Sequence, residues 1–334
     1  MIKRYIALCL LFLGAVLTIY YYQINRNTSV PTIAPVVIFN SPTPSIKEEN
    51  KWTLIATGDV IPARSVNYKT ITNKDFTWAW KDIAPLLKTG DITVINLESP
   101  LLSDCPMTNE GFIFCADMRH IEGLVYAGVD VATLANNHIG NYGKNGIDET
   151  VKLLRSHGID VTGINEEPPI RVVNNIRVGF LAYNDIGAKE EGVSWADTGV
   201  MEKEIQKLRN KVDVVVVSMS WGVEYTATPS ARQKELAHFI IDSGADFVLG
   251  NHPHWTQPVE VYQGKYIVYA HGNTIFDQMW SEETKVGVIG KYTFSGLRLI
   301  NIEFIPTYIK DYGQPILLTG DAKEKVLQKM NTNL

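Results

Sequence analysis

Five short runs of β-branched or aliphatic residues each end abruptly in residues that can bind a metal ion or move a proton. Runs of this length predict buried strands, and ligands in open α/β sheets sit at the carboxyl ends of strands. We therefore expect an α/β fold in which the five strand ends converge on one pocket. The apolar runs and the residues that follow them are 54–57, followed by Gly58 and Asp59; 92–95, followed by Asn96 and Glu98; 131–134, followed by Asn136, Asn137 and His138; 214–217, followed by Ser218 to Gly222; and 247–249, followed by Asn251, His252 and His254.

Helical patterns alternate with these runs. Apolar residues recur at three- and four-residue intervals over 78–87, 145–155, 201–208 and 230–241, which predicts four helices. Gly158 predicts the end of the second helix, and Pro229 predicts the first turn of the fourth. Two polar pairs, Asn174-Asn175 and Gln263-Gly264, each separate two strand-like runs and predict hairpins.

Composition excludes one class of partner. The 334 residues carry a net charge of -5, and no basic patch is concentrated anywhere, so we expect no binding to nucleic acid. The 45% of hydrophobic residues can fill the core of one large domain or two smaller ones.

The N-terminal segment predicts a membrane anchor. Lys3 and Arg4 precede an uncharged apolar stretch, 5–22, that approaches the roughly 20 residues a bilayer requires. By the positive-inside rule, we expect residues 1–24 to form a cytoplasmic start and a single transmembrane helix. The bilayer is then a partner, and the main domain lies outside the cell. A cleaved signal peptide is the alternative, but no small-x-small cleavage site follows the apolar run.

The rest of the chain divides into three parts. Residues 25–50, with four prolines among Ser, Thr and Asn, predict an extended extracellular tether. The folded domain is expected over 51–320, followed by a polar C-terminal tail, 321–334. Cys105 and Cys115 flank a Pro- and Gly-containing loop, and outside the cell they could form a disulfide that stabilises the fold by roughly 2–3 kcal/mol. Two unpaired structural thiols are the alternative.

The first three strand ends carry carboxylates, amides and one imidazole. Asp59 is a hard oxygen ligand, and Gly58 before it lets the backbone turn tightly. Glu98 could bridge two cations that would otherwise repel each other. Either carboxylate could instead cap the next segment. After the third strand, Asn137 and His138 can separate the roles of metal ligand and proton donor, although His138 could also be a loop histidine with structural partners.

The segment His252-Pro253-His254 is the strongest local signal. Proline favours an extended backbone, in which residues two apart project to one side, so both imidazoles could face one metal cluster. Two structural histidines are the alternative. His271 ends a further strand and could line the same pocket.

From about residue 52 to residue 278 the sequence resembles the bacterial CapA capsule-synthesis family, associated with production of poly-γ-glutamate capsules. The resemblance rests on seven motifs in order: Gly58-Asp59-Val60, Asn96-Leu97-Glu98-Ser99-Pro100-Leu101, Ala135-Asn136-Asn137-His138, Trp221-Gly222-Val223-Glu224-Tyr225, Gly244-Ala245-Asp246, His252-Pro253-His254 and Gly272-Asn273.

That family is similar to the calcineurin-like metallophosphoesterases, so the resemblance implies a β-sandwich flanked by helices and a site for one or two divalent metal ions, with Mn, Fe and Zn not distinguished. The implied metal ligands are Asp59, Glu98, Asn137, His252 and His254, and His138 would protonate the leaving oxygen. Residues that could support or substitute for these ligands are Asn96, Asn136, Ser220, His271 and Asn273.

The chain departs from the family pattern at three positions. Ser220 stands where relatives usually have histidine, and a hydroxyl is a poor ligand for a borderline metal. Ile61 stands where the broader phosphoesterases have another histidine, and Glu98 stands where they have aspartate. Either the site holds one metal, or His271 or a water fills the gap.

Two functions therefore stay open. The first is a membrane-anchored, extracellular, metal-dependent hydrolase of phosphate esters or of γ-amide links in a polymer. The second is an accessory protein that binds nascent capsule polymer or a membrane synthase complex without turnover. Retention of the ligand set favours the first, and Ser220 favours the second.

Overall fold

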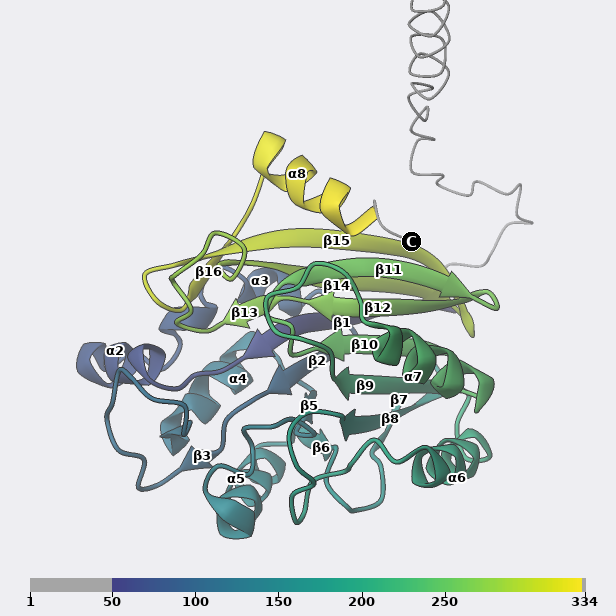
Figure 1. Ribbon diagram of the computed structural model, residues 1–334, viewed down its shortest axis with the longest axis horizontal. Helices are drawn as coiled ribbons and strands as arrows, with labels where there is room; N and C mark the ends of the chain where they lie inside the picture. The colour runs from purple at the N-terminus through teal and green to yellow at the C-terminus, as the bar shows by residue number, and fades with distance from the viewer. Residues whose placement is uncertain (1–49, 332–334) are drawn as a thin grey trace, which may run out of the picture. The chain divides into compact units, whose positions relative to one another are not determined.

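Two β-sheets face each other in the part of the chain that the computed structural model describes, residues 50–331 (Figure 1). The predicted membrane anchor and almost all of the predicted tether lie outside these residues. Among the described residues, no helix is long and apolar enough to cross a membrane.

The first sheet runs in the order β16-β15-β14-β1-β2-β5-β6, and β13 pairs with β1. Its strands β1, β2, β5 and β6 are parallel, whereas β14, β15 and β16 continue the sheet in antiparallel pairs. The bounds are β1 Lys51–Val60, β2 Ile92–Leu97, β5 Val131–Thr133, β6 Asp160–Thr162, β13 Asn273–Ile275, β14 Val286–Ser295, β15 Arg298–Lys310 and β16 Gln314–Leu317.

The second sheet runs in the order β11-β12-β10-β9-β8-β7, with β8, β9, β10 and β12 parallel. The predicted hairpins β7–β8 and β11–β12 are confirmed. Their turns place Asn174, Asn175 and Gln263 at positive φ, as tight hairpins require. The bounds are β7 Ile170–Val173, β8 Ile176–Asn184, β9 Val214–Ser220, β10 Phe247–Asn251, β11 Thr256–Tyr262 and β12 Lys265–His271.

Alternation along the strands builds the sandwich. Successive side chains of a strand point to opposite faces. Val214 and Val216 therefore face the first sheet, where they pack with residues such as Leu54 and Val94, while Val215 and Val217 face outward. The central strands of each sheet, such as β2 and β9, are buried on both faces, which explains their nearly continuous apolar runs in the sequence.

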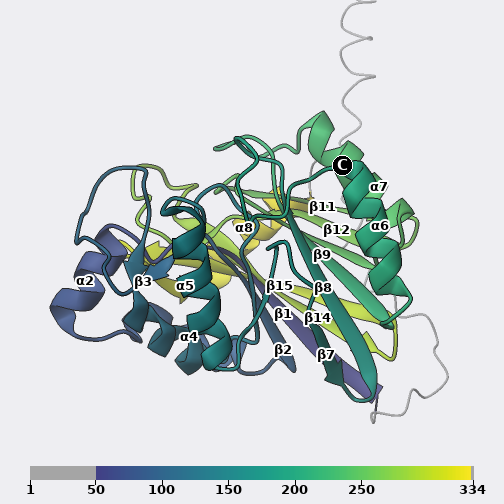
Figure 2. The same ribbon diagram turned by 90° about the horizontal axis from the view of Figure 1, so that it is seen from below.

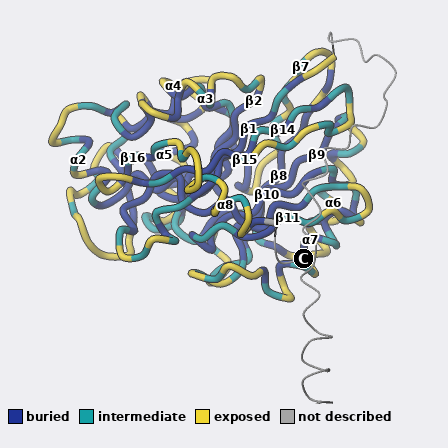
Figure 3. The backbone as a smooth tube through the Cα atoms, turned by 90° about the horizontal axis from the view of Figure 1, so that it is seen from above, coloured by how far each residue is buried: buried dark blue, intermediate teal, exposed yellow. Residues whose placement is uncertain are grey.

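Helices cover the two outer faces. Helices α6 and α7 pack on the second sheet, and α2 to α5 pack on the first, so the order of layers is helix, sheet, sheet, helix (Figures 1 and 2). Buried chain in Figure 3 concentrates in the strands, and exposed stretches lie in loops and on outer helices. The bounds are α2 Ser65–Asn73, α3 Ala84–Leu87, α4 Ile121–Ala127, α5 Gly143–Ser156, α6 Thr198–Arg209, α7 Ala231–Asp242 and α8 Gly320–Asn331, with short 3-10 helices at Trp78–Trp80 and Met118–His120.

Two helix predictions need correction. The helix expected over 78–87 is divided into the 3-10 helix Trp78–Trp80 and α3, because Pro85 lacks an N–H and suits only the first turn of a new helix. Pro229 is not in the first turn of α7. Ser230 is the N-cap instead, since its hydroxyl accepts from Gln233 N and the Gln233 side chain accepts from Ser230 N.

The C-terminal segment also differs from expectation. Residues 320–331 form α8 where the sequence predicted a polar tail. Val326 and Met330 of this helix are buried together with Val288 of β14, so the segment packs on the domain as a polar helix with one apolar face.

The predicted disulfide is confirmed. Cys105 and Cys115 are bonded, with an S–S distance of 2.00 Å and a Cα–Cα distance of 5.8 Å. Short parallel strands, β3 Leu101–Leu102 and β4 Ala116–Asp117, pair at the base of the loop that the disulfide closes.

Candidate metal centre

The predicted polar strand ends converge, but they come from two sheets and not from one rim. Strands β1, β2 and β5 of the first sheet bring Asp59, Glu98 and His138, and strands β9 and β10 of the second bring Ser220 and His252. The two rims meet where the backbone N–H of His252 lies 3.2 Å from Asp59 Oδ1.

Asp59 is the most heavily hydrogen-bonded of these residues. Its carboxylate accepts from Asn96 Nδ2 at 2.9 Å and lies 3.0 Å from His254 Nδ1, in addition to the His252 contact. Burial raises the pKa of the carboxyl, but the hydrogen bond and positive charge of His254 outweigh it, so the pKa lies below its usual value. Asp59 is therefore ionised and held in one orientation.

Gly58 serves a different purpose from the predicted tight turn. A Cβ at this position would lie 1.8 Å from the carbonyl oxygen of Gly272, because β1 and the segment after β12 approach closely. The Asp59 N–H donates to that same oxygen at 2.9 Å. Glycine thus lets two strands meet at the base of the site.

Asn96 connects the carboxylates to the third strand end. Its Nδ2 donates to both Asp59 Oδ1 and Glu98 Oε2, and its Oδ1 accepts from Asn136 Nδ2 at 3.2 Å. The Asn136 side chain also accepts from the His138 backbone N–H at 3.2 Å. Asn96 and Asn136 therefore orient the neighbouring groups.

The backbone of His252-Pro253-His254 is not extended as predicted. His252 and His254 have φ values of 92° and 59°, which are unfavourable for residues with a side chain. Hydrogen bonds hold this strained turn: the Asp59 carboxylate accepts from His252 N, and Pro253 O accepts from Tyr225 N at 2.9 Å. Such strain is common at functional sites.

The turn nevertheless brings both imidazoles to Glu98. One nitrogen each of His252 and His254 and one oxygen of Glu98 lie within 4.8 Å of one another, and all three residues are buried. Burial, reinforced by the Asp59 charge, raises the pKa of Glu98 well above its usual range, and burial lowers the pKa of His252. A bound cation would reverse the cost of ionising Glu98.

His138 lies beside this cluster in a defined tautomer. Asn141 Oδ1 accepts from the backbone N–H of Phe114 at 2.7 Å, which identifies it as the oxygen, and it lies 3.1 Å from His138 Nδ1. Nδ1 therefore carries the hydrogen and Nε2 is left to exchange a proton. Burial lowers the pKa of His138 to about 4.

Several buried polar atoms around the site have no hydrogen-bond partner. They are Glu98 Oε1, Asn137 Oδ1, Ser220 Oγ, Asn251 Oδ1 and His252 Nδ1. An unsatisfied buried polar atom costs about 1–3 kcal/mol, and the carboxylate and amide oxygens and the imidazole nitrogen in this set can each offer a lone pair to a cation. The residues present therefore fit a divalent metal ion.

Three residues are placed where they cannot act as direct ligands. Both ring nitrogens of His271 have partners, Gly250 O at 3.0 Å and the Tyr292 hydroxyl at 2.8 Å, so it does not substitute for the missing histidine. The Asn273 side chain contacts His254 Nδ1 at 3.0 Å and orients that ring. Ile61 lies in a small apolar cluster with Ala63, Phe114 and Phe276.

Two residues of interest were given no role of their own from the sequence. Asn251 lies between Gly250 and His252 in a motif that was recognised, yet only its histidines were considered. Asn141, three residues after His138, orients that imidazole. A search for amide side chains within a few residues of each predicted ligand would have found both.

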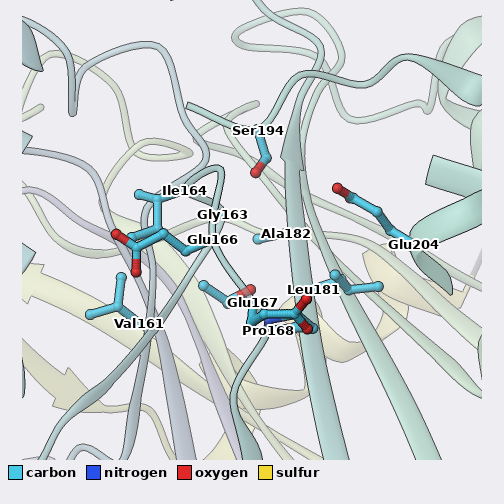
Figure 4. A pocket seen from close by; sticks show the side chains of 11 residues that line it. Val161, Gly163, Ile164, Glu166, Glu167, Pro168, Leu181, Ala182, Ser194 and Glu204 are labelled. Atoms are coloured by element: carbon cyan, nitrogen blue, oxygen red, sulfur yellow. The ribbon is translucent and has the colours of Figure 1, made fainter. Parts of the chain in front are cut away.

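The small surface pocket shown in Figure 4 lies elsewhere, between the ends of β6 and β8. It is lined by residues such as Gly163, Ala182 and Ser194, with three glutamates, Glu166, Glu167 and Glu204. None of the predicted site residues lines it.

Residues 53–278 match the model of the bacterial capsule synthesis protein family PGA_cap. The capsule biosynthesis protein CapA of Bacillus anthracis is 30% identical over 98% of this chain and 81% of its own length. The "PGA biosynthesis protein CapA" of Bacillus subtilis is 28% identical over 72% of this chain and 67% of its own length. A Mycobacterium tuberculosis protein named "Probable polyglutamine synthesis accessory protein" is also 28% identical, over 66% of each chain.

Solved structures support the fold. A phosphatase from Mycoplasma pneumoniae superposes with a TM-score of 0.54 over 83% of this chain and 97% of its own, at 12% identity. A Thermus thermophilus protein gives a TM-score of 0.52 over 77% of this chain and all of its own, at 15% identity. With the fold, the match over 53–278 and the similarity to two Bacillus CapA proteins, the chain belongs to the bacterial capsule synthesis protein family.

Proposed function

We propose that this protein is a membrane-anchored, extracellular, metal-dependent hydrolase that acts in capsule or poly-γ-glutamate biosynthesis. The observation that carries the proposal is the buried group of Glu98, His252 and His254, together with polar atoms at the same strand ends that have no hydrogen-bond partner. A divalent cation held there would supply Lewis-acid polarisation of a phosphate ester or γ-amide link.

The protein's own residues would divide the remaining work. Asp59, Glu98, Asn137, His252 and His254 would hold the cation. His138 would exchange a proton at Nε2 with the leaving group, since Asn141 fixes its Nδ1 hydrogen.

Export and anchoring have separate support. The Cys105–Cys115 disulfide is typical of proteins in oxidising compartments. The apolar segment 5–22 would anchor the domain, with residues 25–50 as its tether. Cell fractionation combined with protease treatment of intact cells tests this topology: the protein should stay with the membranes and lose its main domain to the protease.

An accessory role is the second candidate. Ser220 replaces a histidine ligand and Ile61 lies in an apolar cluster, so the site lacks two of the imidazoles of related phosphoesterases. A protein of this kind would bind anionic polymer or membrane synthase subunits without turnover.

The metal content and turnover of the purified full chain distinguish the two candidates. We expect bound divalent metal by elemental analysis, and hydrolysis of an aryl phosphate or a γ-glutamyl oligomer. His138→Ala should lower turnover at least about 100-fold while metal content changes little. His157→Ala, which removes an exposed imidazole at the end of α5, is the matched control. Metal binding without turnover of either substrate class would favour the accessory role.

A further inference from the structure

The loop between β13 and β14 carries the exposed Trp280 and is anchored in the candidate metal centre. Asn273 Nδ2 donates to Gln278 Oε1 at 3.1 Å and to the carbonyl oxygen of Thr284 at 2.9 Å, and the Thr284 hydroxyl donates to the Gln278 carbonyl oxygen at 2.8 Å. Asn273 Oδ1 lies 3.0 Å from His254 Nδ1. The same amide that orients His254 thus holds the loop before and after Trp280.

Tyr225 links this loop to the turn that carries His254. Its hydroxyl accepts from Gln278 Nε2 at 3.1 Å, and its backbone N–H donates to Pro253 O at 2.9 Å. These contacts hold Tyr225 at a φ of 60°, which is unfavourable for a residue with a side chain. Strain of this kind is common where a side chain is positioned for function.

The rings of His254, Tyr225 and Trp280 form a row, called here the aromatic row. The centre of the Tyr225 ring lies 6.2 Å from that of His254 and 6.2 Å from that of Trp280, which it meets edge to face at 78°. The exposed fraction rises along the row, from 2% for His254 to 37% for Tyr225 and 59% for Trp280. The row therefore connects the buried centre with the surface, and it ends in two rings that face water and are held in place. Exposed apolar groups beside a functional centre are typical of a ligand-binding surface.

A carboxylate lies beside the aromatic row. Glu224 precedes Tyr225 in the same turn and is half-buried. Burial lowers the pKa of His138 and of His252, and the charge of Glu224 opposes this shift in both. The Glu224 carboxylate is thus within electrostatic reach of the metal centre, and it has no ion-pair partner among residues 50–331.

The cationic side chains that contact the loop between β13 and β14 are all paired. They are Arg64 with Asp277, Lys285 with Glu282, and Lys329 with Glu283. A polyanion that approaches the aromatic row would therefore meet the Glu224 carboxylate and find these cations already neutralised.

We propose that Tyr225 and Trp280 form a subsite that stacks against a sugar ring of the substrate, and that Glu224 accepts hydrogen bonds from its hydroxyl groups. The proposal rests on the hydrolase function proposed above and narrows its substrate to phosphate esters of sugars. The C–H face of a sugar ring is apolar and packs on an aromatic ring, whereas its hydroxyls donate to carboxylates. An acyl chain would desolvate Glu224 without giving it a hydrogen bond, and a poly-γ-glutamate chain would be repelled by it.

Two binding measurements on the purified full chain test the proposal. In hydroxyl-radical footprinting, a panel of hexose 1-phosphates should protect Trp280 from oxidation, and glycerol 1-phosphate, which has no ring, should not. In calorimetric titrations, Trp280→Ala should weaken hexose 1-phosphate binding by about three- to tenfold, the value of one aromatic contact, and leave glycerol 1-phosphate binding unchanged. Trp280→Phe keeps an aromatic face and should retain most of the affinity.

Tyr126→Ala provides the matched control, because it removes an exposed ring from α4 on the outer layer of the molecule. It should leave both affinities unchanged. Thermal unfolding shows whether each variant folds, and the wild-type footprint tests the subsite without any substitution.

The outcomes separate the subsite from the hydrolase function. If no hexose 1-phosphate binds more tightly than glycerol 1-phosphate, or if Trp280→Ala changes neither affinity, the sugar subsite is overturned, while hydrolysis of glycerol 1-phosphate would still support the hydrolase. Protection of Trp280 by a γ-glutamyl oligomer or by dodecyl phosphate, and not by hexose 1-phosphates, would overturn it in favour of the polymer or an acyl chain. Protection by hexose 1-phosphates that are not hydrolysed would support the subsite and contradict the hydrolase.

Discussion

The two rims that meet at the candidate metal centre differ in how their polar atoms are satisfied. On the first sheet, Asp59 and Asn96 have all their polar side-chain atoms in hydrogen bonds, and Asn136 supports the chain that follows β5. On the second sheet, Ser220 Oγ, Asn251 Oδ1 and His252 Nδ1 have no partner. Asp59 and Asn96 are therefore held by the protein itself, although Glu98 Oε1 and Asn137 Oδ1 of the same rim also lack a partner, and at the second rim the strand ends of both β9 and β10 carry unpartnered atoms.

The difference shows where the stability of the metal-free fold and the capacity to bind a ligand oppose each other. A satisfied buried network stabilises the fold and fixes geometry, whereas unpartnered acceptors cost stability until a ligand arrives. Substitutions in the first rim should therefore damage the metal-free protein, and substitutions in the second should matter mainly when metal is present.

The largest effect is expected for Asp59→Ala. The change removes the charged partner of His254, which keeps only Asn273 Oδ1, and leaves the His252 N–H and one hydrogen of Asn96 without their acceptor. Removing one partner of a buried charge pair costs about 3–5 kcal/mol. Urea unfolding of the metal-free protein measures this loss. Asp91→Ala, which removes an exposed carboxylate that accepts from Thr53 N at the opposite end of β1, should cost much less. Similar losses in the two variants would contradict the preorganised rim.

Removing the disulfide should have the next largest effect. Replacing Cys105 and Cys115 by serine frees a short loop, which should lower the free energy of unfolding by roughly 2–3 kcal/mol. Phe114 lies beside Cys115 and donates to Asn141, which orients His138. Hydrogen exchange should therefore speed up at Phe114 and around Asn141 while residues 251–254 stay unchanged. Equal acceleration at both rims would show that the rims are not independent.

Acid sensitivity should come partly from outside both rims. His120 is buried against Asn67, and burial lowers its pKa to about 4. Because the unfolded chain takes up this proton near pH 6.5 and the folded chain only near 4, stability falls as pH drops through that window. By pH 5 the loss from His120 should reach about 2 kcal/mol.

His120→Gln removes this contribution. Urea unfolding between pH 8 and pH 5 should show a shallower decline for the variant than for the wild-type protein. If stability declines equally with pH in the variant and the wild-type protein, groups other than His120 cause the acid sensitivity. His120→Gln would then not serve as the reference protein for comparing the two rims at low pH.

The smallest effect is expected for Ser220→Ala without metal. Deleting an unpartnered buried hydroxyl should change the free energy of unfolding by no more than about 1 kcal/mol, and towards greater stability. The sign should reverse at saturating Mn²⁺, where the wild-type protein gains more from binding. A clear loss of stability in the metal-free variant would mean that the Ser220 hydroxyl already has a partner.

Much of the fold could be predicted from local patterns. The five apolar runs are strands, the turns at Asn174-Asn175 and Gln263-Gly264 are hairpins, and three predicted helices lie close to where periodicity placed them. These features depend on side-chain alternation and on turn residues, and both are set by residues only a few positions apart in the sequence. The match to the CapA pattern relied on the same motifs.

Tertiary structure decided how those parts meet. Only long-range pairing divides the strands between two sheets, brings β1 close enough to Gly272 to require Gly58, and holds His252 and His254 at positive φ. The free end of the Asn251 amide likewise depends on Ser218, 33 positions earlier in the chain. The sequence by itself determined which side chains reach the strand ends. Which of their atoms have partners and which remain free to bind depends on contacts across the sandwich, and local patterns carry no information about those contacts.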